Sequence, residues 1–253
     1  MLEITNLSCG YSSGDIVKNF GMTVHEGEKL CISGPNGCGK TTLLRAISGM
    51  LAYNGSAKID GWEISSMSRR ELSGKVAMFS QISSVYFGYT VYDTVAMGRY
   101  LKQKGAFSES RKDSQATLSC LERLGLLSIK DKPITELSGG QLQRTMLART
   151  FNQEPQIILL DEPTNHLDIS AQISLIKLIK EWAAEDNRRS VVGVIHEISL
   201  IPMLFERTVL MSGGEKLADG GTAKVLKSSE LATAYGADVA GFMQDCYKFW
   251  KQK

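Results

Sequence analysis

Residues Gly34 to Thr41 read Gly-Pro-Asn-Gly-Cys-Gly-Lys-Thr, which matches the phosphate-binding pattern G-x-x-x-x-G-K-[S/T]. Residues 29–33 before this stretch predict a buried strand, and residues 42–50 after it predict a helix. This setting disfavours the alternative of an ordinary glycine-rich turn. Glycines let successive backbone N–H groups face one concavity, and the start of a helix adds partial positive charge there. We therefore expect Lys40 to reach the β- and γ-phosphates of a nucleotide, and the hydroxyl of Thr41 to ligate Mg2+.

Two acidic residues follow a second predicted strand. Residues 157–160 form a continuous apolar run, as expected for a parallel strand that is buried on both faces. Asp161 and Glu162 come directly after it, at the strand end where open α/β sheets bind ligands. Adjacent acids are more often part of a solvated turn, but acids that close a buried strand favour a functional role. Residues 190–195 predict another buried strand, which would bring His196 to the same edge.

A third candidate site begins a helix that is predicted over residues 142–151. The stretch before it reads Ser138-Gly139-Gly140-Gln141. Its serine and glutamine satisfy the S-x-x-Q capping box, so an ordinary helix start is one interpretation. The paired glycines favour a second one, because they leave the first amides of the helix open to close approach by an anion.

Hydrophobic patterns predict the remaining elements. Residues 2–7 alternate apolar and polar side chains and residues 17–24 offer a second strand, so the chain should begin with a half-exposed antiparallel sheet. Tyr11, between them, is either a solvent-facing aromatic or a platform on which a base stacks. Further predictions are an edge strand at 55–61, a core strand at 75–80, a mainly helical stretch from 90 to 151, and a hairpin over 207–212 and 215–220. The apolar stripe of one more helix comprises Ile169, Ile173, Ile176, Ile179 and Trp182.

Composition and charge narrow the class of protein. The 253 residues carry 29 basic and 27 acidic side chains, which gives a net charge of +2. The chain therefore lacks the excess of basic residues that is typical of a nucleic-acid binder. The five cysteines form no C-x-x-C pair and favour a reducing cytoplasm. No apolar run approaches the roughly 20 residues that span a bilayer, and no signal peptide is evident. We therefore expect any membrane association to come through a partner.

With these motifs in order, the chain resembles the ATP-binding subunit of an ABC transporter over nearly its whole length. The resemblance implies an α/β fold: a P-loop NTPase core with a mainly parallel sheet, an N-terminal antiparallel β-subdomain and an inserted helical subdomain. It implies one ABC ATPase domain over residues 1–253, with the helical subdomain at about 88–152 and a short C-terminal tail at about 237–253. ATP and Mg2+ are the implied cofactors.

The resemblance also implies roles for individual residues. Tyr11 resembles the aromatic that stacks on adenine, and Asp161 resembles the Walker B aspartate that holds Mg2+ through water. The implied catalytic residues are Glu162, which orients the attacking water, the switch histidine His196, the Q-loop glutamine Gln81 and Lys40. The implied Mg2+ site comprises Thr41, Gln81 and Asp161. The other residues implied to bind nucleotide are Gly34, Pro35, Asn36, Gly37, Cys38, Gly39, Lys40, Thr41 and Thr42 of the Walker A loop, the signature residues Ser138, Gly139, Gly140 and Gln141, and Asp168 of the D-loop.

In proteins of this family two copies face head to tail, so we expect an ATP-dependent homodimer in which one copy's signature helix covers the other copy's nucleotide. The implied partners are integral membrane permease subunits and, indirectly, a periplasmic or lipoprotein solute-binding protein. We expect no nucleic acid, and we expect the protein at the cytoplasmic face of the membrane, held there by the permease.

Residues 90–99 are similar to their counterparts in importers of iron-siderophore, haem and cobalamin type. This similarity predicts uptake of an iron chelate, haem or a cobalamin-like solute. The alternative is a soluble ABC ATPase that acts in DNA repair or translation. Cys38 stands where serine or alanine is common in the family, and its place beside Lys40 and a helix N-terminus predicts an acidified, reactive thiol.

Overall fold

The computed structural model describes residues 1–12, 14–80, 88–102, 110–165 and 167–251, and only the backbone of residues 249–251. The described chain divides into two compact units. Unit 1 joins the two ends of the chain, Met1–Ser66 and Ser190–Lys253, and unit 2 is the middle of the chain, Met67–Arg189. The predicted Gln81 site lies outside the described residues.

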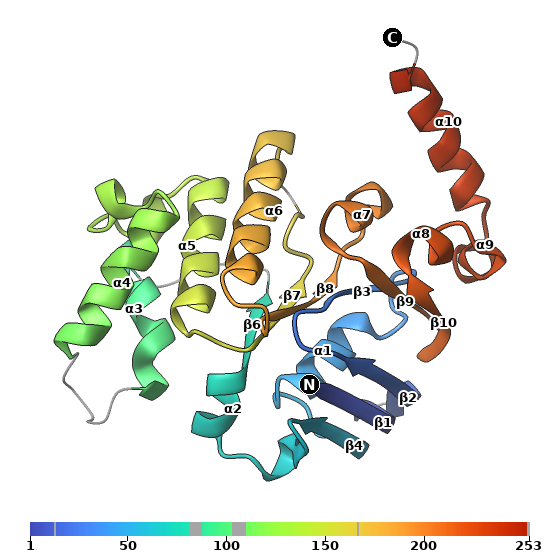
Figure 1. The fold of residues 1–253 in the computed structure, drawn as a ribbon, viewed down its shortest axis with the longest axis horizontal. Helices are drawn as coiled ribbons and strands as arrows, with labels where there is room; N and C mark the ends of the chain where they lie inside the picture. The colour runs from blue at the N-terminus through green and yellow to red at the C-terminus, as the bar shows by residue number, and fades with distance from the viewer. Residues whose placement is uncertain (13, 81–87, 103–109, 166, 252–253) are drawn as a thin grey trace. The chain divides into compact units, whose positions relative to one another are not determined.

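Unit 1 opens with the antiparallel sheet that the alternating pattern predicts (Figure 1). Its strand order is β2-β1-β4-β5, with β1 at Leu2–Tyr11, β2 at Gly14–Val24, β4 at Asn54–Ile59 and β5 at Trp62–Glu63. Apolar side chains such as Leu2 and Ile4 are buried on one face of β1. The prediction of an edge strand at 55–61 is wrong, because β4 pairs with β1 on one side and with β5 on the other.

A second set of strands in unit 1 carries the phosphate loop. The order is β10-β9-β3-β8, with β3 at Lys29–Ser33, β8 at Ser190–Val194, β9 at Arg207–Ser212 and β10 at Glu215–Gly221. Strand β3 runs parallel to both β8 and β9. Strands β9 and β10 form the expected hairpin around Gly213 and Gly214. Every residue of β8 is buried, as the apolar run predicts.

Short helices complete unit 1. They are α1 at Lys40–Ile47, η1 at Ile64–Ser66, η5 at Ile198–Leu200, α7 at Ile201–Leu204, α8 at Thr222–Val225, α9 at Ser229–Tyr235 and α10 at Val239–Lys251. The expected C-terminal tail is therefore largely the helix α10 (Figure 1). Met243 and Tyr247 of α10 and Leu231 of α9 line an apolar cavity of about 230 Å³.

Unit 2 combines two parallel strands with helices. The strands are β6 at Val76–Ser80 and β7 at Ile157–Asp161. The helices are α2 at Arg69–Lys75, α3 at Val91–Ala96, η2 at Met97–Lys102, α4 at Arg111–Arg123, η3 at Leu127–Ile129, η4 at Ile134–Glu136, α5 at Gly139–Asn152 and α6 at Ile169–Ala184. The predicted stripe of α6 is only partly correct. Ile179 and Trp182 are buried, whereas Ile169 is 75% exposed and Ile173 is 64% exposed.

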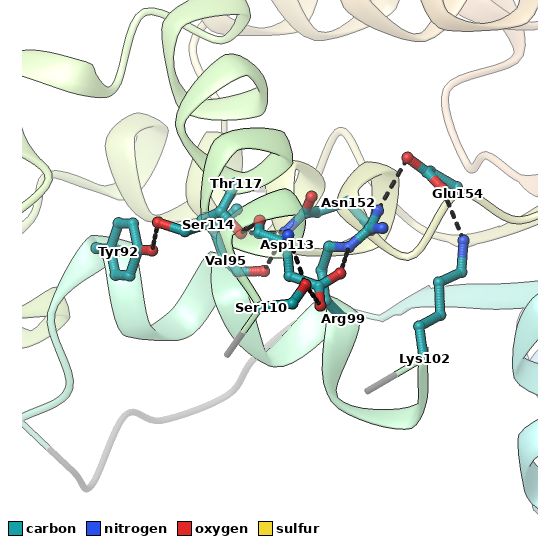
Figure 2. Close-up of polar contacts among 10 residues, drawn as sticks. All are labelled: Tyr92, Val95, Arg99, Lys102, Ser110, Asp113, Ser114, Thr117, Asn152 and Glu154. Carbon is teal, nitrogen blue, oxygen red and sulfur yellow. Dashed lines mark hydrogen bonds and ion pairs between the residues drawn. The ribbon is translucent and has the colours of Figure 1, made fainter. Parts of the chain in front are cut away.

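A polar network, buried at Arg99, Asp113, Thr117 and Asn152, holds the helices of unit 2 together (Figure 2). The guanidinium of Arg99 donates to Asp113 at 2.8 Å and pairs with Glu154 at 2.9 Å. The side chain of Asn152 donates to the carbonyl of Val95 at 2.9 Å and to the Thr117 hydroxyl at 3.0 Å. The network thereby ties η2, α3, α4 and the end of α5 to one another.

Candidate functional site

The first half of the site is the loop between β3 and α1. Gly34, Gly37 and Gly39 all have positive φ, at 149°, 78° and 104°. A Cβ atom on Gly34 would lie 2.1 Å from the carbonyl oxygen of Met211, so the loop can approach β9 only with glycine there. The loop thus takes the tight course that its sequence predicts and delivers the first amides of α1 to its concave side.

Lys40, the first residue of α1, is buried inside this loop. Its Nζ atom donates to the carbonyl oxygens of Gly34 and Pro35, both at 2.8 Å, and lies 3.9 Å from the sulfur of Cys38. The lysine charge is therefore held among loop carbonyls, where an incoming phosphate would find a positioned cation. Thr41 follows half-buried and Thr42 buried.

The predicted acidification of Cys38 is wrong. Its side chain is buried, and burial raises the pKa of the thiol above its ordinary value although Lys40 beside it acts in the opposite direction. Desolvation outweighs the cation because the thiolate would lose its water inside the packed loop. The loop therefore carries a protonated, poorly reactive thiol rather than a nucleophile.

Two further predicted residues lie on unit 1. Tyr11 ends β1 with its ring exposed, and its hydroxyl accepts a hydrogen bond at 2.8 Å from Arg45 of α1. The phosphate-loop helix thus anchors Tyr11 while its ring remains open to a ligand. His196 follows β8, whose residue Val194 is in register with Ile32 of β3. Because these parallel strands end together, His196 emerges at the same edge as the phosphate loop.

The acidic pair lies on unit 2, at the carboxyl end of β7. Asp161 is the last residue of this fully buried strand, and Glu162 follows it with φ of 53°. Positive φ is uncommon for a residue with a long side chain, and such conformations cluster at functional sites. The side-chain amide of Asn165 donates to the carboxylate of Glu162 and orients it. His166, beside this turn, lies outside the described residues.

The signature residues are at the start of α5. Ser138 is the N-cap, and its hydroxyl accepts from the Gln141 amide at 3.3 Å while the Gln141 side chain accepts from the Ser138 amide at 3.0 Å. The capping-box interpretation is therefore confirmed. The capping box does not exclude anion binding at the same helix start, because the space beside Gly139 is open. A Cβ atom on Gly139 would meet no other atom within 4 Å.

The starts of α5 and α6 line one pocket of about 640 Å³. Asp168 is the N-cap of α6, where its carboxylate accepts from the Ala171 amide at 2.8 Å. The residues that line this pocket include Ser138, Gly139, Gly140, Gln143, Arg144 and Asp168. Gln143 and Arg144 are not among the site residues that the sequence predicted. They lie one turn after Gly139 and Gly140 on the same side of the predicted helix, and this spacing is the signal that could have identified them.

The glycine loop after a parallel strand, with its buried lysine, defines a phosphate-loop nucleotide-binding protein of the α/β class. The family model described as ABC transporter matches residues 17–165, more than half of the chain. The chain belongs to the ABC transporter family. The expected fold class, an antiparallel N-terminal sheet with a phosphate-loop core of parallel strands, is thus confirmed.

Curated relatives extend the similarity to almost the whole chain. It is 34% identical over 96% of its length to the uncharacterized ABC transporter ATP-binding protein YvrA of Bacillus subtilis, and spans 55% of that relative. It is 33% identical over 93% of its length to the hemin import ATP-binding protein HmuV of Rhizobium etli, and covers 90% of it. The chain is also 34% identical over 89% of its length to the probable siderophore transport system ATP-binding protein YusV of Bacillus subtilis, and it spans 82% of that relative.

Solved structures agree with these relatives. A metal-chelate type ABC transporter in an inward-facing conformation has a TM-score of 0.80 at 27% identity, covering 93% of this chain and 88% of that one. The ATP-binding cassette MJ0796, in a dimeric post-hydrolysis state with ADP and Pi, has a TM-score of 0.77 at 28% identity, covering 88% of this chain and 99% of that one. The chain is an ATP-binding ATPase of this family.

Proposed function

We propose that the chain hydrolyses MgATP as a head-to-tail homodimer. In this dimer the phosphate loop of one copy and the Ser138–Gln141 segment of the other enclose each nucleotide. The pocket at the starts of α5 and α6 carries this proposal, since it presents two helix N-termini and the Arg144 side chain. The exposed Ile169 and Ile173 at the start of α6 add apolar surface of the kind that a partner copy covers.

A phosphate loop alone leaves the γ-phosphate open to water, and the amides of a second helix can cover it and stabilise its charge. In the proposed site Lys40 binds the phosphates, Tyr11 offers its ring to the base, and Glu162 orients the attacking water. His196 holds the γ-phosphate and that water in register. Gln81 and Asp168 keep the roles that the family resemblance implies.

The donor set fits Mg2+. The Thr41 hydroxyl and the Asp161 carboxylate are hard oxygen ligands, and Mg2+ is commonly held by one or two protein oxygens together with substrate phosphates and water. Within the described ranges no group of three or more His, Cys, Asp or Glu side chains could hold a metal by itself. In the proposed site, phosphate oxygens of the nucleotide complete the ligands of Mg2+. When bound, Mg2+ would neutralise charge that develops on the phosphates.

Complementation between two inactive variants tests the shared site. Lys40→Ala removes the phosphate-binding cation, and Gly139→Asp places a negative charge at the α5 tip, where the added side chain has open space. Each variant alone should be inactive. Mixed dimers contain one site with both wild-type halves, so the mixture should regain ATPase activity. A mixture as inactive as its components would reject the head-to-tail site. Gly74→Asp, at another open glycine of unit 2, is the control and should retain activity.

We further propose that ATP hydrolysis drives import through membrane permease subunits that hold the chain at the cytoplasmic face, with a solute-binding protein delivering the solute. An iron chelate or haem is the proposed solute, on the support of relatives named for hemin import and siderophore transport. Within the described residues no helix has both the length and the apolar character to cross a bilayer.

Reconstitution into proteoliposomes tests the coupling. The chain and candidate permease subunits would be assembled with ATP on the cytoplasmic side, and uptake of a ferric siderophore, haem and cobalamin would be compared. ATP-dependent uptake of an iron chelate or haem is expected. Uptake of cobalamin alone would revise the solute. ATPase activity that responds to DNA or ribosomes and not to any permease would favour the soluble alternative.

A further inference from the structure

The last residue of α9 reaches the phosphate loop from the far end of the sequence. The hydroxyl of Tyr235 lies 3.4 Å from the hydroxyl of Ser33, the last residue of β3. Ser33 is followed directly by Gly34, the first residue of the loop. Ser33 is fully buried, so water does not compete for its contact with Tyr235.

The ring of Tyr235 is fixed independently of its hydroxyl. It packs against the apolar cluster of Leu210, Val225 and Leu231. Directly after it, Gly236 adopts a left-handed conformation with φ of 65°, which ends α9 and sets the position of the tyrosine. Burial raises the pKa of Tyr235 above its ordinary value, so the hydroxyl keeps its proton at physiological pH.

Gly34 links this contact to the phosphate-binding lysine. It follows Ser33 directly, its carbonyl accepts from Nζ of Lys40 at 2.8 Å, and its Cα faces the carbonyl of Met211 so closely that no Cβ fits. The orientation of the Gly34 peptide therefore depends on the junction at Ser33 at one end and on Lys40 at the other. A change at Tyr235 reaches Lys40 through Ser33 and Gly34.

We propose that Tyr235 is a positioning residue of the nucleotide site, which fixes the strand-to-loop junction at Ser33 and Gly34 and so the geometry of the phosphate loop. The inference rests on the proposed function of this loop. It makes the segment after β10 part of the nucleotide site's support, although none of that segment's residues need touch the nucleotide.

The test is Tyr235→Phe, which keeps the ring in its apolar cluster and removes only the hydroxyl. ATP affinity and steady-state ATPase kinetics would be measured on the full chain. We expect ATP affinity to fall about fivefold, the scale of one lost buried hydrogen bond, with KM rising in parallel and kcat changing less than twofold. A purely structural role would instead lower the melting temperature and leave KM unchanged.

Tyr53→Phe is the matched control, because the Tyr53 hydroxyl is also hydrogen-bonded within unit 1 but to Glu63, at 2.7 Å, away from the loop. It should retain wild-type affinity. Ser33→Ala and the double variant complete the test. If the two hydroxyls share one contact, the double variant should lose less ATP binding free energy than the two single variants lose in total. Wild-type affinity in Tyr235→Phe, or an equal loss in Tyr53→Phe, would overturn the inference. Failure of the wild-type chain to bind ATP would instead reject the proposed function.

Discussion

Nζ of Lys40 donates a hydrogen bond to the carbonyl oxygen of Gly34 at 2.8 Å, so the phosphate loop closes on its own lysine. A second carbonyl, that of Pro35, accepts from the same atom at 2.8 Å. These carbonyls hold the ammonium group in place but do not neutralise it. An anionic phosphate is a stronger acceptor than a carbonyl, so the lysine is both positioned and available for exchange.

Lys40→Ala should therefore weaken MgATP binding about tenfold to a hundredfold, the scale of a charge-assisted hydrogen bond in a desolvated site. Equilibrium titration with a fluorescent ATP analogue would measure the affinity. Lys248→Ala, which removes an exposed lysine of α10, is the control and should leave it unchanged. An affinity within twofold of wild type in Lys40→Ala would contradict the assignment of this loop.

Glu162→Gln should slow ATP hydrolysis about a hundredfold or more while ATP stays bound. The amide retains the shape of the side chain, but it cannot act as the carboxylate that orients the attacking water. Single-turnover hydrolysis and size-exclusion chromatography with ATP would show slow chemistry together with a stabilised dimer. Glu181→Gln, on the exposed side of α6, is the control. Wild-type turnover in Glu162→Gln would exclude Glu162 from positioning the water.

Arg99→Met should lower the free energy of unfolding by about 3–5 kcal/mol, because it leaves the buried carboxylate of Asp113 without its cation. Hydrogen bonds from Ser110 and then Arg99 hold the pKa of that carboxylate below its ordinary value, which reflects how strongly the charged form is stabilised (Figure 2). Urea unfolding would measure the change. Arg188→Met breaks an exposed pair with Asp186 and should cost less than about 1 kcal/mol. Equal costs in the two variants would contradict the structural role of the network.

The phosphate loop was predictable because its determinants are local. Positive φ at Gly37 and Gly39, the strand before them and the helix after them all follow from a dozen consecutive residues. The capping box at Ser138 was predictable for the same reason. Apolar runs likewise predicted β7 and β8, since complete burial leaves a continuous hydrophobic signature.

The features that the sequence did not predict depend on contacts between residues that are far apart in the chain. Ser33 and Tyr235 are 202 positions apart, and no local pattern links them. The motif around Cys38 suggested a low pKa, but the burial that raises it comes from packing of the loop. The spacing of apolar residues in α6 correctly predicted an amphipathic helix. It did not predict that Ile169, in the first turn of this helix, is exposed.

Buried thiols should make the fold sensitive to alkaline pH. Burial raises the pKa of Cys31 to about 12, whereas an unfolded chain has a thiol pKa of about 8.5. The folded state therefore binds the proton more tightly, so this stabilisation is complete below about pH 8.5 and is lost as pH rises toward 12. In that window one such thiol lowers the free energy of unfolding by about 1.4 kcal/mol per pH unit. Cys31→Ala should flatten the dependence by that amount in urea unfolding between about pH 9.5 and 10.5. Cys246→Ala, at an exposed cysteine, should keep the wild-type slope, and parallel slopes for wild type and Cys31→Ala would contradict the prediction.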